Sequence, residues 1–139
     1  MELFRKLNLK TGTPVVLVNL PPSLEGLAAE GAFGPDAQSE SFGQAPGTEP
    51  GGPSVAQAVV FVRSPEEVAK GLGTLSAGLT DDPVLWFSYP KRGSAVSATV
   101  SRDEGWEALG QAGFQPVRQV AVNGDWSALR FRDRRFVGR

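Results

Sequence analysis

The chain has no cysteine and no histidine among its 139 residues. These absences exclude disulfide bonds, thiol nucleophiles, the common zinc sites and every catalytic triad that needs an imidazole base. We therefore expect no metal site. Proton transfer would be left to carboxylates, lysines, the single tyrosine or a bound cofactor, and ordinary tyrosine and lysine pKa values of about 10 are unsuited to acid–base work at neutral pH.

The chain also lacks long apolar segments. No run approaches the roughly 18 apolar residues of a membrane span, and the first residues lack the apolar core of a signal peptide. We therefore expect a cytoplasmic protein that binds no membrane. Hydrophobic residues make up 40% of the chain, and a chain of this length buries about two-thirds of its unfolded surface. These values predict one α/β domain over residues 1–139.

Charge is unevenly distributed along the chain. Residues 1–90 carry five basic and ten acidic groups, whereas residues 91–139 carry nine and five. A basic C-terminal part is typical either of a solvated surface or of a patch for an anionic ligand. The last ten residues, RFRDRRFVGR, contain five arginines but no nucleic-acid-binding motif. This pattern favours a frayed, solvated terminus over a nucleic-acid site.

The first half of the chain predicts one strand and a long loop. Residues 14–20 hold a continuous aliphatic run, VVLV, which is typical of a buried strand in a parallel sheet. Pro22 can open a short helix after it. Residues 31–54 contain six glycines and four prolines, so we predict a long loop within the domain, with a short edge strand near residues 40–43. A lid over a cleft is the alternative interpretation.

The second half has clearer helix and strand signals. An apolar run at residues 57–62 is followed by SPEE, in which Ser64 can cap a helix and Glu67 can hydrogen-bond back to its start. An apolar stripe that ends at Leu79 predicts a helix packed on a sheet. The sequence VLWFSYP, residues 84–90, then predicts another buried strand.

Two further signals lie near the C-terminus. The sequence SRDEGW, which begins at Ser101, has the pattern of a second capping box that starts a helix. Asn123 and Gly124, between two β-like runs, predict an antiparallel hairpin. In its second run, WSALRF, Trp126 and Ala128 should face one side of the sheet, and Leu129 and Phe131 the other.

The alternation of strands and helices predicts a three-layer Rossmann-like α/β domain. We expect a mostly parallel sheet that ends in an antiparallel hairpin. Strands near residues 14–20, 57–62 and 84–89 should be parallel neighbours. The terminal hairpin resembles the end of the class I methyltransferase fold, although a shared fold does not establish a function.

Five polar residues are candidates for ligand binding, because parallel strands bring their carboxyl ends to one edge where ligands usually bind. Asn19 and Arg63 follow two of the predicted strands. Tyr89, Lys91 and Arg92 follow the third, in SYPKRGS. Their cations and hydrogen-bonding groups favour a small anionic ligand. The alternative is a structural turn with exposed cations, and no residue is assigned a catalytic role.

The sequence after the first strand argues against a nucleotide site. Dinucleotide and methyl-donor sites need glycines there, so that the backbone approaches the ligand. Here the positions hold Asn19, Leu20, Pro21 and Pro22. Each proline removes an N–H donor, so phosphate binding is poorly supported, and a methyl donor has little room.

From Leu85 onward the chain resembles a family of small uncharacterised bacterial proteins, a domain of unknown function. The resemblance rests on LWFSYPK (85–91), RDEGWEAL (102–109), QPVRQVAV (115–122) and WSALRFR (126–132). It implies a Rossmann-like domain similar to a methyltransferase that has lost its donor loop, and it implies no activity. The glycine- and proline-rich middle of the chain departs from the family pattern.

Together these features predict a non-catalytic protein that binds a small anionic ligand or interacts with another protein, and nucleic acid is disfavoured. The alternative is an S-adenosylmethionine-dependent methyltransferase-like enzyme. Only this alternative requires a cofactor, namely S-adenosylmethionine, and the residues leave open whether the protein is an enzyme.

Overall fold

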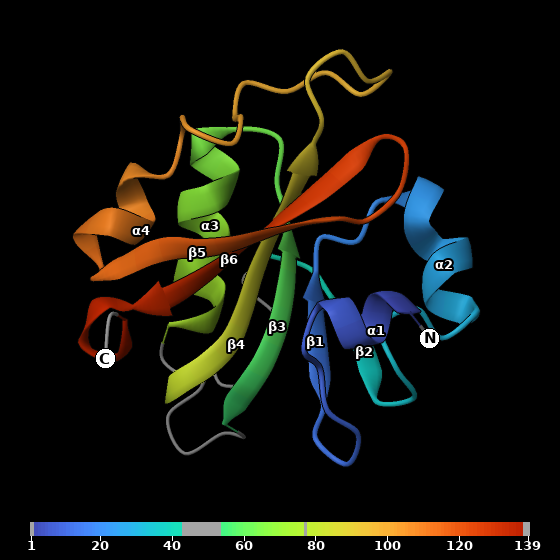
Figure 1. Ribbon diagram of the computed structural model, residues 1–139, viewed down its shortest axis with the longest axis horizontal. Coiled ribbons are helices and arrows are strands. Elements are labelled where there is room, and N and C mark those ends of the chain that lie inside the picture. The colour runs from blue at the N-terminus through green and yellow to red at the C-terminus, as the bar shows by residue number, and fades with distance from the viewer. Residues whose placement is uncertain (1, 43–53, 77, 138–139) are drawn as a thin grey trace.

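The fold is seen in a computed structural model that describes residues 2–42, 54–76 and 78–137 (Figure 1). Its elements are α1 (Glu2–Lys6), β1 (Val15–Val18), η1 (Pro22–Leu24), α2 (Glu25–Ala29), β2 (Ala37–Glu40), β3 (Val55–Phe61), α3 (Pro65–Leu75), β4 (Leu79–Pro90), α4 (Glu107–Gln111), β5 (Phe114–Ala121), β6 (Trp126–Asp133) and η2 (Arg134–Phe136). No helix in these ranges is long and apolar enough to cross a bilayer.

The six strands form one sheet in the order β2-β1-β3-β4-β6-β5. Strands β1 to β4 are parallel, and β6 pairs antiparallel with both β4 and β5. This confirms the predicted α/β class, the antiparallel end and the parallel β1, β3 and β4. The Asn123 side chain closes the β5–β6 turn by accepting hydrogen bonds from the backbone N–H groups of Asp125 and Trp126, both at 2.9 Å.

The sheet is covered on both faces, as the predicted three layers require (Figure 1). One core contains Phe87 and Leu129 beneath α3 and α4. The other contains Phe61, Trp86 and Trp126 beneath the α1 and α2 region. Along β6 the side chains alternate as predicted, because Trp126 and Ala128 belong to the second core and Leu129 and Phe131 to the first.

Helix α3 begins as the sequence predicts. The Ser64 hydroxyl accepts a hydrogen bond from the Glu67 backbone N–H at 3.2 Å, and a Glu67 carboxylate oxygen accepts one from the Arg63 backbone N–H at 2.7 Å. The helix ends at Leu75, however, and Leu79 begins β4 instead of extending the apolar stripe.

The predicted helix start at Ser101 is wrong. Helix α4 begins at Glu107, and its N-cap residue Trp106 makes no side-chain capping bond. The reason lies at Gly105, whose φ of 103° is left-handed and cannot continue a right-handed helix. The turn before the helix is instead closed by the Ser101 backbone N–H, which donates to the Glu104 carbonyl at 3.1 Å.

Two other expectations also need correction. The edge strand predicted near residues 40–43 is β2, which lies at Ala37–Glu40, whereas residues 43–53 of the predicted loop lie outside the described residues. The terminus is not frayed up to residue 137. Strand β6 runs to Asp133, and Arg132 makes a two-pronged ion pair with Asp82, with hydrogen bonds of 3.0 and 2.7 Å.

The two edges of the sheet are short or irregular. Strand β2 has four residues, and β5 contains Pro116, beside which the register with β6 shifts before Arg118. A proline is tolerated in β5 because an edge strand leaves some backbone N–H groups outside the ladder.

Candidate functional site

Two clefts lie at the carboxyl ends of the parallel strands. The larger one, here called the polar cleft, has a volume of about 850 Å³ and is lined by the end of β4, the 91–104 segment, Gln119 and Ser127. The smaller one, here called the apolar cleft, has a volume of about 390 Å³ and is lined by residues 19–23, Arg63, Val96 and Trp126. Val96 lines both clefts, so the 91–104 segment separates them.

Asn19 organises one end of the apolar cleft. Its φ of 63° is left-handed, a conformation that asparagine tolerates better than most residues. Its side-chain amide donates to the Phe61 carbonyl at 2.9 Å, and its backbone N–H donates to the Glu40 carbonyl at 2.9 Å. Asn19 therefore ties the end of β1 to the ends of β3 and β2, which is a structural role.

Arg63 follows β3 and lines the same cleft. Its side chain is 57% exposed, and its Nε lies 4.0 Å from a carboxylate oxygen of Glu67. Its carbonyl accepts a hydrogen bond from the Thr99 backbone N–H at 2.8 Å. This bond attaches the 91–104 segment to the end of β3 and so helps to shape both clefts.

Trp126 forms a wall of the apolar cleft. The residue is only 3% exposed, and its ring packs edge-on against Phe61, with centroids 6.0 Å apart. Its Nε1–H is buried and has no hydrogen-bond partner in the described part of the chain. The other two indoles differ, because Trp86 Nε1 donates to the Leu7 carbonyl at 2.7 Å and Trp106 Nε1 to the Ser101 carbonyl at 2.8 Å.

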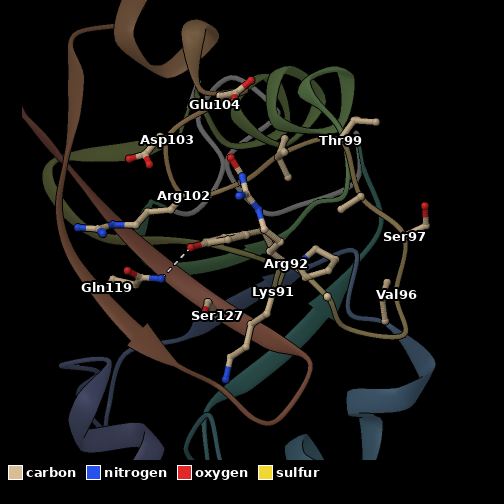
Figure 2. Close-up of a pocket in the computed structure, with 16 residues that line it drawn as sticks. Lys91, Arg92, Val96, Ser97, Thr99, Arg102, Asp103, Glu104, Gln119 and Ser127 are labelled. Carbon is tan, nitrogen blue, oxygen red and sulfur yellow. Dashed lines mark hydrogen bonds between the residues drawn. The ribbon is translucent and has the colours of Figure 1, made fainter.

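Tyr89 lines the polar cleft, and Figure 2 shows Gln119, its hydrogen-bond partner, at the same cleft. It is 3% exposed, and its hydroxyl accepts a hydrogen bond from Gln119 Nε2 at 2.9 Å. Burial raises the pKa of the Tyr89 hydroxyl above 10.0, and the nearby charge of Arg102 opposes this shift. The hydroxyl therefore stays protonated at neutral pH and offers hydrogen bonds rather than a base.

Three cations line the polar cleft, and none of them forms an ion pair with a residue in the described ranges: Lys91, Arg92 and Arg102. Figure 2 shows Lys91 and Arg92 extending in opposite directions from the end of β4. Asp103 and Glu104 also line the cleft. The cleft can therefore bind an anion at one of these cations, but it repels a polyanion that would reach both carboxylates.

The five residues predicted for one site are divided between the two clefts. Asn19 and Arg63 line the apolar cleft, whereas Tyr89, Lys91 and Arg92 line the polar cleft.

Three lining residues from the antiparallel hairpin were not predicted from the sequence, Gln119, Ser127 and Trp126, and neither were Arg102, Asp103 and Glu104 of the 91–104 segment. In the hairpin, the pairing of β4 with β6 sets Tyr89 opposite Ser127 and Pro90 opposite Trp126. The sequence at Asn123 indicated a hairpin, but it did not indicate the register that brings these residues to the same edge of the sheet.

A solved structure shares this fold. A crystal structure of an S-adenosylmethionine-dependent methyltransferase from Aquifex aeolicus is similar, with a TM-score of 0.61 and 12% sequence identity over 94% of this chain and 87% of that one. LepI in complex with S-adenosylmethionine gives a TM-score of 0.48 and 13% identity, and a LepI variant with S-adenosylhomocysteine and a substrate analogue gives 0.49 and 15%. This chain spans 39% of each LepI chain.

At such low identity the likeness to the Aquifex aeolicus protein shows a common methyltransferase-like fold and nothing more specific. No protein-family model and no curated protein matches the chain. Membership of the small bacterial family therefore stays a prediction.

Proposed function

We propose that the protein binds a small anionic ligand in the polar cleft and does not catalyse a reaction on it. The observation that carries this proposal is that three cations line the cleft, Lys91, Arg92 and Arg102, and that no ion pair with a described residue neutralises them. Cations without partners at a concave surface attract anions, and the volume of about 850 Å³ falls within the usual range for ligand pockets.

The polar groups of the cleft favour a compact ligand with hydrogen-bonding groups of its own. Tyr89 and Gln119 already bond to each other, and Ser127 also hydrogen-bonds Tyr89, so two side chains of the hairpin hold the Tyr89 hydroxyl in place. Asp103 and Glu104 disfavour nucleic acid, whose phosphates would approach these carboxylates. A small carboxylate or phosphate with hydroxyl groups suits this combination.

Binding is better supported than catalysis because Tyr89, the buried polar group of the cleft, is a poor base, which leaves proton transfer to the carboxylates of Asp103 and Glu104. The pKa of Tyr89 is shifted upward by burial, which is the wrong direction for proton abstraction at neutral pH. The chain has no histidine or cysteine to replace it.

The alternative function is that of an S-adenosylmethionine-dependent methyltransferase, which the likeness in fold to the Aquifex aeolicus protein favours. A donor at the end of β1 needs backbone N–H groups or close approach to the backbone. In this chain Pro21 and Pro22 have no N–H, and the Asn19 amide group already donates to the Phe61 carbonyl. The residues after β1 therefore do not fit this cofactor.

A thermal-shift screen with inorganic phosphate, sulfate, citrate and S-adenosylmethionine tests the proposal. A ligand present at a hundred times its dissociation constant stabilises the fold by about 2.7 kcal/mol, which is readily measured. We expect an anion to raise the melting temperature, and Lys91→Ala or Arg92→Ala to weaken that effect while changing stability by about 0.5 kcal/mol or less.

The matched control is Lys70→Ala, which removes an exposed cation on α3 that lines neither cleft. This variant should respond to anions as the wild type does. Equal binding by the Lys91, Arg92 and Lys70 variants would refute the polar cleft as the site. Stabilisation by S-adenosylmethionine alone would favour the methyltransferase alternative.

A further inference from the structure

The apolar cleft has features that the anion-binding proposal does not use. Its walls are Leu20, Pro21, Pro22 and Val96. Its volume of about 390 Å³ lies within the range of small-molecule pockets. A ligand here would contact apolar surface along most of its length, unlike a ligand in the polar cleft.

One buried hydrogen-bond donor at this cleft has no partner. Trp126 is 3% exposed and lines the cleft, and its Nε1–H meets no acceptor in the described residues. Leaving a buried donor unsatisfied is costly, and the indole N–H can only donate. Trp86 and Trp106 both donate to backbone carbonyls, so among the three indoles only that of Trp126 has no acceptor in the described residues. An acceptor on a ligand that reaches this N–H from the cleft would satisfy it.

A cation lies in the same cleft. The Arg63 side chain is more than half exposed, its guanidinium makes no hydrogen bond to a described residue, and its ion-pair contact with Glu67 is long, at 4.0 Å. A guanidinium has five N–H donors arranged for bidentate contact with a carboxylate. Arg63 therefore supplies a positive charge to the cleft that Trp126 also lines.

We propose that the apolar cleft binds a small monocarboxylate with an apolar body. The carboxylate contacts the Arg63 guanidinium and accepts the Trp126 indole N–H, and the hydrocarbon part packs against Pro21, Pro22 and Val96. A phosphate ester fits less well, because the prolines supply no backbone N–H and the walls offer few polar groups.

The test uses hexanoate as the probe and the three indole N–H signals in ¹H–¹⁵N NMR spectra as the readout. Hexanoate should shift the Trp126 indole signal in a saturable manner and leave the Trp86 signal in place. The signal that disappears in Trp126→Phe is assigned to Trp126. If Trp126→Phe does not fold, Trp86→Phe and Trp106→Phe assign the other two signals, and the third then belongs to Trp126. Hexanol, which has the same hydrocarbon chain without the carboxylate, should bind much more weakly.

Arg63→Gln should weaken hexanoate binding about ten-fold or more, as expected for the loss of a charge-assisted hydrogen bond. Lys91→Ala, which alters only the polar cleft, should leave hexanoate binding unchanged. The inference is overturned if the Trp126 signal does not saturate, if hexanol binds as tightly as hexanoate, or if Arg63→Gln binds normally. Phosphate binding that depends on Lys91 reports separately on the polar cleft, so either proposal can fail alone.

Discussion

Trp86 and Trp126 allow the cost of one unpaired hydrogen-bond donor to be measured. Both indoles are almost fully buried in the same core, but within the described ranges only Trp86 Nε1 has a partner, the Leu7 carbonyl at 2.7 Å. Replacing each by phenylalanine removes the N–H and part of the ring. The lost apolar contact is similar in the two variants, so their difference in stability isolates the hydrogen bond.

The two substitutions should differ by at least about 2 kcal/mol in the free energy of unfolding. Trp86→Phe leaves the buried Leu7 carbonyl without its donor, which costs about 1–3 kcal/mol. Trp126→Phe removes a donor that has no acceptor, which relieves a cost of about the same size. Trp86→Phe should therefore be clearly the more destabilising change, although both variants lose ring contacts.

Urea denaturation of the wild type and both variants measures this difference, provided that the slopes of the transitions agree. The measurement should be made without carboxylates in the buffer, because a ligand of the apolar cleft would stabilise the wild type. Equal losses in the two variants, or a larger loss for Trp126→Phe, would show that the Trp126 N–H is satisfied in solution. The reasoning that places a ligand acceptor beside it would then be wrong.

Three further predictions concern the helix packed on β3 and the polar cleft. Gly71→Ala should destabilise the fold by about 1–3 kcal/mol, because its new Cβ would clash with Val60 Cγ1. Gly73→Ala on the same helix meets nothing within 4 Å and should stabilise the fold by about 0.5–1 kcal/mol. Thermal unfolding of the two variants compares these effects. Ser64→Ala should cost about 1 kcal/mol in urea denaturation by removing the α3 cap, and an unchanged midpoint would contradict that role. Because the pKa of Tyr89 is raised in the folded state, its contribution to stability is present below pH 10 and is lost as the pH rises through the pKa of the folded state. Tyr89→Phe should flatten the alkaline part of the plot of unfolding free energy against pH. Identical plots for the wild type and the variant would contradict the raised pKa.

The sequence predicts the centre of this fold well because its signals there are local. Continuous aliphatic runs such as Val15–Val18 occur where a strand is buried on both faces, and they mark the parallel strands. The Ser64 cap needs only neighbouring residues. The start of α4 could not be predicted in the same way, because it depends on the left-handed backbone of Gly105, which a capping-box pattern does not reveal.

The candidate site is predicted only in part, for a related reason. Strand ends correctly indicate which residues reach the sheet edge, but the path of the 91–104 segment decides how they are grouped. That path depends on a contact distant in sequence, the hydrogen bond from Thr99 to the Arg63 carbonyl. The contribution of Trp126 depends on two features that a sequence does not show. One is the pairing of β6 with β4, and the other is the lack of an acceptor for the Trp126 Nε1–H among the described residues.

The irregular edge strands affect the tendency of this protein to aggregate at high concentration. An outer strand with a long, regular row of unpaired N–H and C=O groups is a template for intermolecular pairing and aggregation. Here β2 offers four residues, and β5 is interrupted by Pro116, by the adjacent shift in register and by the exposed charge of Arg118. Neither edge presents an uninterrupted template, so the open sheet can be six strands wide without recruiting a seventh from another molecule.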